Sequence, residues 1–155
     1  MKVLQLIDSL NAGGAERVAV NYSNSLASRI ETSFLCSTRE EGMLKTSLSK
    51  DVQYLFLNKK STLDFKAIKR LNRFMKVNKI IIIHAHSTSF FLATIIKILN
   101  PKIKVVYTSH NLNIGSKFRE LIVWSLKLFR NIRQNLLSEG KTSKYFKYAI
   151  GEIVL

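Results

Sequence analysis

The sequence contains a single cysteine, Cys36, so no disulfide can form within the chain. Proteins of oxidising compartments usually carry paired cysteines, whereas an isolated thiol is ordinary in a reducing one. The cysteine count therefore excludes a disulfide-stapled fold and predicts a cytosolic protein.

Proline and glycine are also scarce, with one proline and six glycines in 155 residues. Collagen-like and low-complexity disordered chains need far more of both. With 46% hydrophobic residues, a chain of this length can bury one sizeable core. The composition predicts one globular domain.

Long apolar runs are absent. The longest are "IIII" at 80–83 and "SFFLATII" at 89–96, whereas a membrane-spanning helix needs about 20 apolar residues. The N-terminal apolar stretch 3–7 is too short for a signal peptide, and Asp8 interrupts it. The sequence therefore predicts neither a membrane span nor a secretory signal.

Acidic residues are few, with 10 against 25 basic residues, which gives a net charge of +15. Residues 1–57 are neutral, with six residues of each sign, whereas residues 58–104 carry eleven basic residues and only Asp64 as an acid. Residues 117–147 add eight basic residues against Glu120 and Glu139. This asymmetry indicates an anionic partner, such as a membrane surface, a nucleic acid or a phosphorylated substrate.

Strand-like and helix-like segments alternate along the chain. Strands are expected at 2–7, 32–37, 52–57, 79–86 and 103–110. Helices are expected at 14–28, 42–50, 63–77, 88–99 and 117–136. Such alternation predicts an α/β domain with a parallel sheet of about five strands. The unbroken apolar character of 79–86 predicts a strand covered on both faces.

Two helices show a clear apolar face. In the first, this face is expected to comprise Ala15, Val18, Ala19, Tyr22 and Leu26. In the helix 63–77 it is expected to comprise Phe65, Ile68, Leu71 and Met75, and the opposite face carries Lys66, Lys69, Arg70, Arg73 and Lys76. That basic row is either a solvated surface or a contact with anionic lipid. Nucleic acid is a weaker alternative, because the basic segments lack a recognisable motif of stacking aromatics.

Ligands of parallel α/β sheets bind outside the carboxyl ends of the strands. This rule selects the loops 8–14, 84–88 and 109–116, which hold Gly13, Gly14 and all three histidines. The glycines can adopt positive φ and admit a ligand to the free N–H groups of the following helix, which favours a phosphate or a sugar. Neither G-x-G-x-x-G nor a P-loop pattern is present, and a tight turn without a ligand is an equal alternative.

The three histidines have different expected roles, according to their positions in the sequence. His84 is expected to be a packed, hydrogen-bonded core residue, with His86 pointing to the same side of the strand. We discount a metal site, because no carboxylate or cysteine lies nearby in the sequence to complete it. His110, followed by Asn111, is the candidate for a substrate-facing imidazole. Its alternative is a histidine that caps the loop backbone.

Three segments taken together resemble a known family. "MKVLQLIDSLNAGGAERVAVNYSNSL", "IIIIHAHST" and "VVYTSHN" are similar to the N-terminal domain of glycosyltransferase family four, over roughly residues 1–130. These are retaining transferases with two Rossmann-like domains. The resemblance implies strand order 3-2-1-4-5 and transfer of a sugar from a nucleotide diphosphate donor to a cell-surface polysaccharide or lipid-linked glycan. It implies no cofactor besides that donor substrate.

The resemblance also implies roles for individual residues. Asn11, Gly13, Gly14, Glu16 and Arg17 would line the wall that faces the donor phosphates. His86, His110 and Asn111 would face the sugar, with His110 in contact with it. In this family the basic and apolar helices of the N-terminal domain often rest on the inner face of the plasma membrane, so a peripheral position is expected.

Two departures from the family accompany the resemblance. The second domain, which carries most nucleotide contacts and the E-x7-E element, has no counterpart in the sequence, and "LKLFRNIRQNLLSEGKTSK" replaces an expected strand. We expect a Rossmann-like domain over 1–136, an atypical tail over 137–155, and a truncated chain that is inactive alone. A separately encoded C-terminal half would restore activity, and the apolar side of the helix 117–136 would otherwise promote self-association. The alternative is a non-enzymatic domain that binds an anionic membrane or a partner protein.

Overall fold

The computed structural model describes residues 1–108 and 110. They belong to one compact unit, Met1–His110. The expected helix 117–136, the tail 137–155 and Asn111 lie outside the described residues, so the predicted division of the chain into 1–136 and 137–155 stays a prediction.

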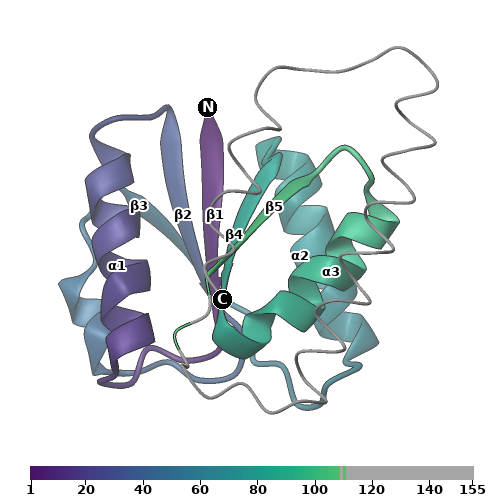
Figure 1. Ribbon diagram of the computed structural model, residues 1–155, viewed down its shortest axis with the longest axis horizontal. Coiled ribbons are helices and arrows are strands. Elements are labelled where there is room, and N and C mark those ends of the chain that lie inside the picture. Colours follow the sequence, from purple (N-terminus) through teal and green to yellow (C-terminus); the bar gives the residue numbers. More distant parts are fainter. Residues whose placement is uncertain (109, 111–155) are drawn as a thin grey trace. The chain divides into compact units, whose positions relative to one another are not determined.

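The described residues form a five-stranded sheet flanked by helices (Figure 1). The strands are β1 (Lys2–Ile7), β2 (Thr32–Ser37), β3 (Val52–Phe56), β4 (Ile82–His86) and β5 (Lys104–Thr108). The helices are α1 (Gly14–Ala27), α2 (Phe65–Asn78) and α3 (Phe90–Leu99), with short 3-10 helices η1 (Met43–Ser47) and η2 (Ser87–Ser89). Within residues 1–108 the predicted elements are therefore confirmed. Most of their ends differ from the expected bounds by one to three residues.

The sheet has the order β3-β2-β1-β4-β5, and each neighbouring pair is parallel. The predicted strand order and the Rossmann-like α/β class are thus confirmed. In the register, Leu4 of β1 lies between Phe34 of β2 and Ile83 of β4. All five carboxyl ends point to one edge, because every pair is parallel.

Two apolar clusters fill the faces of the sheet. Leu4, Leu6 and Phe34 join residues of α2 and α3, such as Leu71 and Ile96, in the larger cluster. Ile7 and Leu35 pack with Ala19 and Val20 of α1 in the smaller one. Accordingly, α1 lies on one side of the sheet and α2 and α3 lie on the other (Figure 1). The buried Cys36 belongs to the larger cluster, and burial raises the pKa of its thiol.

Two predictions about side-chain placement and one strand boundary are wrong. Tyr22 is 48% exposed, and the buried residues of α1 are Ala19, Val20 and Ser23. Ser23 can be buried because its hydroxyl donates to the Ala19 carbonyl, 2.9 Å away. Phe65 is 77% exposed, because it is the first residue of α2, directly after the Asp64 cap, and Ala67 takes its place in the core. Strand β4 begins at Ile82 rather than at residue 79, because Lys79 adopts the left-handed conformation that ends α2.

None of the helices within the described residues is long and apolar enough to cross a membrane. This agrees with the short apolar runs of the sequence.

Candidate functional site

The carboxyl edge of the sheet brings the histidines together. His86 ends β4, and His110 follows β5, the next strand in the sheet. Nδ1 of His86 lies 3.0 Å from Nε2 of His110, and the two rings stack with centroids 5.3 Å apart. The predicted convergence of these two residues at one place on the edge is what the structure shows.

His84 lies beside this pair on the same face of β4. Its ring centroid is 4.3 Å from that of His86, and its Nε2 is 2.8 Å from the hydroxyl of Thr108 on β5. The ring of Tyr22 on α1 lies 5.5 Å from His84 and 6.4 Å from His86. His84 is therefore the packed, hydrogen-bonded residue that the sequence predicts, and Tyr22 covers this face.

Burial keeps two of these rings neutral. Burial, with a smaller effect of the neighbouring charges of His84 and His110, lowers the pKa of His86 to about 3. Burial and the charge of His110 lower the pKa of His84 to about 4. At neutral pH both rings are hydrogen-bonding groups without charge.

The sequence analysis missed Gln5, although it is a polar residue inside an apolar strand. Gln5 lies in β1, is 1% exposed, and its Oε1 is 2.8 Å from Nε2 of His86. Both ring nitrogens of His86 thus have partners, Gln5 and His110. Among residues 1–108 and 110, no three histidine, cysteine or acidic side chains gather in a way that could hold a metal ion.

Asp8, the second residue missed as a site residue, ties three strand ends together. Its carboxylate accepts a hydrogen bond of 2.6 Å from Thr38, which follows β2, and another from Thr88 in η2, after β4. Its carbonyl accepts from the backbone N–H of Arg39 at 2.8 Å. The position directly after β1 is the signal that could have identified it, because ligand loops of such sheets begin there.

The glycine pair does not use the conformation that the sequence suggested. Gly13 is extended, with φ −152° and ψ 166°, and Gly14 is the first residue of α1, so neither glycine uses the positive φ that it could adopt. Gly14 leaves open space, because a Cβ there would meet nothing within 4 Å. Gly13 caps α1 without any side-chain hydrogen bond, and the first N–H groups of a helix attract anions.

The other residues of the expected phosphate wall lie around this helix start. A Cβ on Gly13 would come within 2.2 Å of the Glu16 carboxylate, which is therefore already at the N-terminus of α1. The Arg17 N–H donates to the Gly13 carbonyl at 3.0 Å, and the Arg17 residue is exposed. The Asn11 amide donates to the Glu40 carboxylate at 2.6 Å, and both residues are exposed.

Among the glycines of residues 1–108, Gly42 is the one whose small size the fold requires. A Cβ there would lie 2.1 Å from the backbone carbon of Leu10, inside the loop 8–14. The neighbouring Leu44 N–H donates to the Leu10 carbonyl at 3.0 Å. The segment around Gly42 thus packs against the loop 8–14 of the candidate site and helps to hold its backbone in place.

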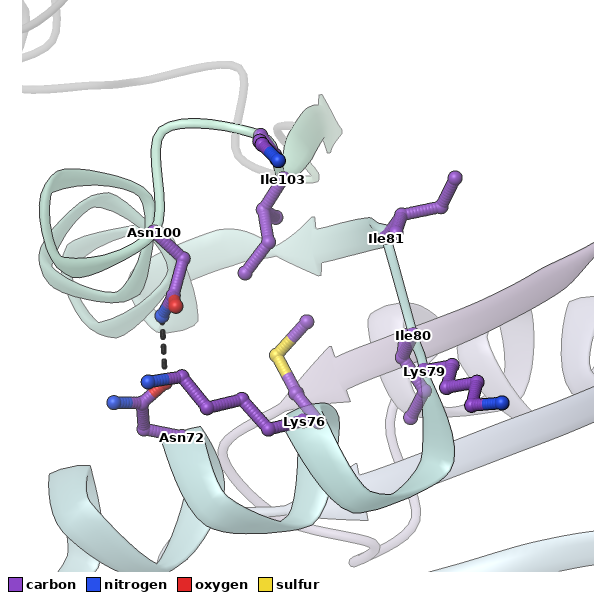
Figure 2. A pocket seen from close by; sticks show the side chains of 9 residues that line it. Asn72, Lys76, Lys79, Ile80, Ile81, Asn100 and Ile103 are labelled. Carbon is purple, nitrogen blue, oxygen red and sulfur yellow. Dashed lines mark hydrogen bonds between the residues drawn. The ribbon is translucent and has the colours of Figure 1, made fainter.

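A shallow pocket of about 180 Å³ lies elsewhere (Figure 2). Met75, Ile80 and Ile103 contribute its apolar lining, and Asn100 donates to Asn72 at 2.5 Å beside it. Its residues precede β4 and β5, so it lies at the amino ends of these strands, opposite the histidines. It is separate from the candidate site.

The predicted basic row is confirmed as an exposed surface. Lys66, Lys69, Arg70, Arg73 and Lys76 are all exposed on α2. This surface is distinct from the carboxyl edge that holds the histidines.

Comparison with protein families gives a match to one family over most of the chain. The family model described as Glycosyltransferase Family 4 matches residues 12–140, which include Gly13, His86 and His110. No curated protein shows a significant match to the sequence. The matched range contains α1 to β5 of the sheet described above, and the chain belongs to glycosyltransferase family 4.

Proposed function

We propose that this chain forms the acceptor-side half of a glycosyltransferase. The reaction would move a sugar from a nucleoside diphosphate donor to a hydroxyl of a glycan or lipid-linked acceptor. The observation that carries the proposal is the hydrogen-bonded pair of His86 and His110, which lies on the same sheet edge as the start of α1, where no side chain caps the helix. Family membership supports the reaction class.

The start of α1 is suited to the diphosphate. Negative charge develops on the departing diphosphate during transfer, and preorganised N–H groups stabilise such charge. At this helix start a Cβ on Gly14 would meet no atom within 4 Å, so a ligand could approach the backbone there. The carboxylate of Glu16 lies at the same helix end, so it must move aside when a phosphate binds, and Arg17 offers a compensating positive charge.

The histidines are suited to the sugar. A neutral imidazole exchanges hydrogen bonds with hydroxyl groups without attracting the diphosphate. We assign this contact to His110, held by His86, with Asn111 as its expected neighbour. Transfer also requires a donor-binding domain opposite this edge, which we propose is supplied by a separate C-terminal half.

The proposal is tested by mixing the purified chain with C-terminal halves of family members. Transfer of radiolabelled sugar from UDP-glucose or GDP-mannose to a membrane extract is then measured. We expect transfer with the unchanged chain, and a loss of at least tenfold with Gly14→Ala. Because the added Cβ meets no protein atom within 4 Å, that variant should fold normally, and its loss would come from the ligand.

The control variant is Lys50→Ala, which changes an exposed residue away from the carboxyl edge. It should transfer sugar like the unchanged chain. Absence of transfer with every half tried, or equal transfer by the Gly14→Ala chain, would contradict the proposal.

A second candidate function is contact with an anionic membrane surface, with or without transfer. The specific observation is that the exposed basic row of α2 is flanked by two exposed apolar side chains, Phe65 at 77% and Val77 at 71%. Basic residues attract anionic headgroups, and exposed apolar side chains enter the headgroup region. We propose a peripheral position on the cytoplasmic face of the membrane on this basis.

A further inference from the structure

Gln5, His86 and His110 form a line of hydrogen bonds that crosses three strands. Gln5 lies in β1, His86 ends β4, and His110 follows β5, and these strands are neighbours in the sheet. The two links measure 2.8 Å, from Oε1 of Gln5 to Nε2 of His86, and 3.0 Å, from Nδ1 of His86 to Nε2 of His110. This line reaches from the buried sheet to the candidate sugar-facing ring.

The first link sets the direction of the second. An amide oxygen only accepts hydrogen bonds, so Nε2 of His86 must carry the hydrogen. A neutral imidazole has one N–H, and burial keeps His86 neutral because it lowers the ring's pKa to about 3. Nδ1 of His86 therefore carries no hydrogen and acts as an acceptor through its lone pair. Nε2 of His110 must donate a hydrogen bond to it.

We propose that Gln5 is a positioning residue that, through His86, fixes His110 in the Nε2–H tautomer, with its Nδ1 left as an acceptor for a sugar hydroxyl. The tautomer follows from the hydrogen bonds and the neutral, buried ring of His86, whereas the hydroxyl as ligand rests on the proposed function. A neutral ring in this form accepts from a hydroxyl group at Nδ1 but has no hydrogen there for a phosphate oxygen. Gln5 would thereby set which part of the donor His110 recognises.

The surroundings hold the line in place. Gln5 is 1% exposed and His86 is fully buried, with the rings of His84 and Tyr22 packed beside it. The backbone of His86 is fixed as well, because its N–H donates to the Ser89 hydroxyl at 3.0 Å. Ser89 Oγ lies 2.7 Å from the Leu6 carbonyl and bonds to it, which ties this turn to β1.

The test is a long-range ¹H–¹⁵N correlation spectrum of the histidine rings in the full chain at pH 8.5, about two units above the ordinary pKa of a histidine side chain. The spectrum distinguishes a protonated ring nitrogen from an unprotonated one. We expect His86 and His110 both to carry the hydrogen on Nε2. An Nδ1–H ring at either residue would overturn the proposal, because it would mean that the amide group of Gln5 donates instead.

Variants separate positioning from simple stabilisation. Gln5→Leu removes the acceptor, and we expect the pure Nε2–H signature of His110 to be lost. Gln5→Glu keeps an acceptor at the same place and should restore it. Ser33→Ala, a buried change on the same face of neighbouring β2, should leave both tautomers unchanged. An unaltered His110 signature in the Gln5→Leu chain overturns the role of Gln5. Should that chain fail to fold, the tautomers of His86 and His110 in the unchanged chain and in the Gln5→Glu chain decide the question.

Ligands test the second half of the proposal. In the presence of a C-terminal half with which the chain transfers glucose from UDP-glucose, this donor should shift the Nδ1 resonance of His110 in a saturable way, whereas UDP, which lacks the sugar, should not. Binding of UDP-glucose to the Gln5→Leu chain should be about tenfold weaker, as for the loss of one oriented hydrogen bond. An equal shift with UDP overturns the hydroxyl assignment. No shift with either ligand overturns the sugar contact of the proposed function, while the tautomer result still stands by itself.

Discussion

At the scale of single residues, burial gives ordinary side chains unusual properties. His84 and His86 are held neutral, and each of them has a specific hydrogen-bond partner. The sequence predicted that the two rings share a side of β4, because that follows from strand alternation. It could not indicate Gln5 as the partner of His86, because one polar residue in an apolar strand forms no periodic pattern.

The first prediction concerns the pH dependence of stability. The pKa values of His84 and His86 fall from 6.5 to about 4 and about 3 on folding, so the unfolded chain binds more protons below pH 6.5. The free energy of unfolding should therefore decrease as the pH falls from 6.5 to 5, by up to about 1.4 kcal/mol for each pH unit and each histidine. Urea denaturation at several pH values measures this.

The same experiment on the His84→Gln chain supplies the control. Glutamine does not titrate, so the dependence between pH 6.5 and 5 should be about half as steep. This range lies above the usual pKa of carboxylates, which keeps their contribution small. A stability that does not change over this range would contradict the neutral state of the two buried rings.

The second prediction compares two buried serines of β2. Ser33 Oγ has no hydrogen-bond partner within the part of the chain that the structure describes, whereas Ser37 Oγ is 2.5 Å from the hydroxyl of Tyr54. An unpaired buried hydroxyl is unfavourable, so Ser33→Ala should leave stability unchanged or raise it by about 1 kcal/mol. Ser37→Ala should lower it by about 1 kcal/mol. Equal losses in thermal or urea unfolding would show that Ser33 has a partner after all.

At the scale of elements, strand and helix types could be predicted and their exact surfaces could not. The strands follow from short apolar segments between turn residues, and the parallel order follows from their alternation with helices. Phe65 shows the limit of the prediction from periodicity. A helical pattern does not reveal which residues of the first turn lie too far from the sheet to be buried. Gly42 shows another, because its need to be small arises from contact with Leu10, which is distant in sequence.

The third prediction therefore concerns Gly42. Replacing it by alanine places a Cβ 2.1 Å from the Leu10 backbone, so the loop 8–14 or the segment before η1 must shift. We expect a loss of about 1–3 kcal/mol of stability, as for other overpacked sites. The matched control is Gly14→Ala at the start of α1, which meets nothing and adds a good helix former, so stability should be equal or higher. A Gly42→Ala chain as stable as the Gly14→Ala chain would contradict the close contact.

At the scale of the whole described unit, the sheet separates two surfaces. The histidines and the start of α1 lie at the carboxyl ends of the strands, whereas α2 presents its basic row from one face of the sheet. The sequence predicted both surfaces, because strand ends and helix periodicity each follow from local patterns. Whether the second surface contacts a membrane depends on a partner that local patterns do not specify.

The last prediction tests that contact. Lys69→Gln combined with Arg73→Gln removes two charges from the exposed row of α2, whereas Arg29→Gln combined with Lys50→Gln removes two exposed charges elsewhere. At about 1 kcal/mol for each residue near an anionic bilayer, the α2 double variant should bind phosphatidylglycerol vesicles about thirtyfold more weakly than the unchanged chain. The control double variant should bind nearly as well, and 0.5 M salt should weaken binding by both unchanged and control chains, because salt screens exposed charges.

Equal weakening by the two double variants would assign the binding to net charge alone. Binding to duplex DNA without any vesicle binding would instead favour a nucleic-acid partner.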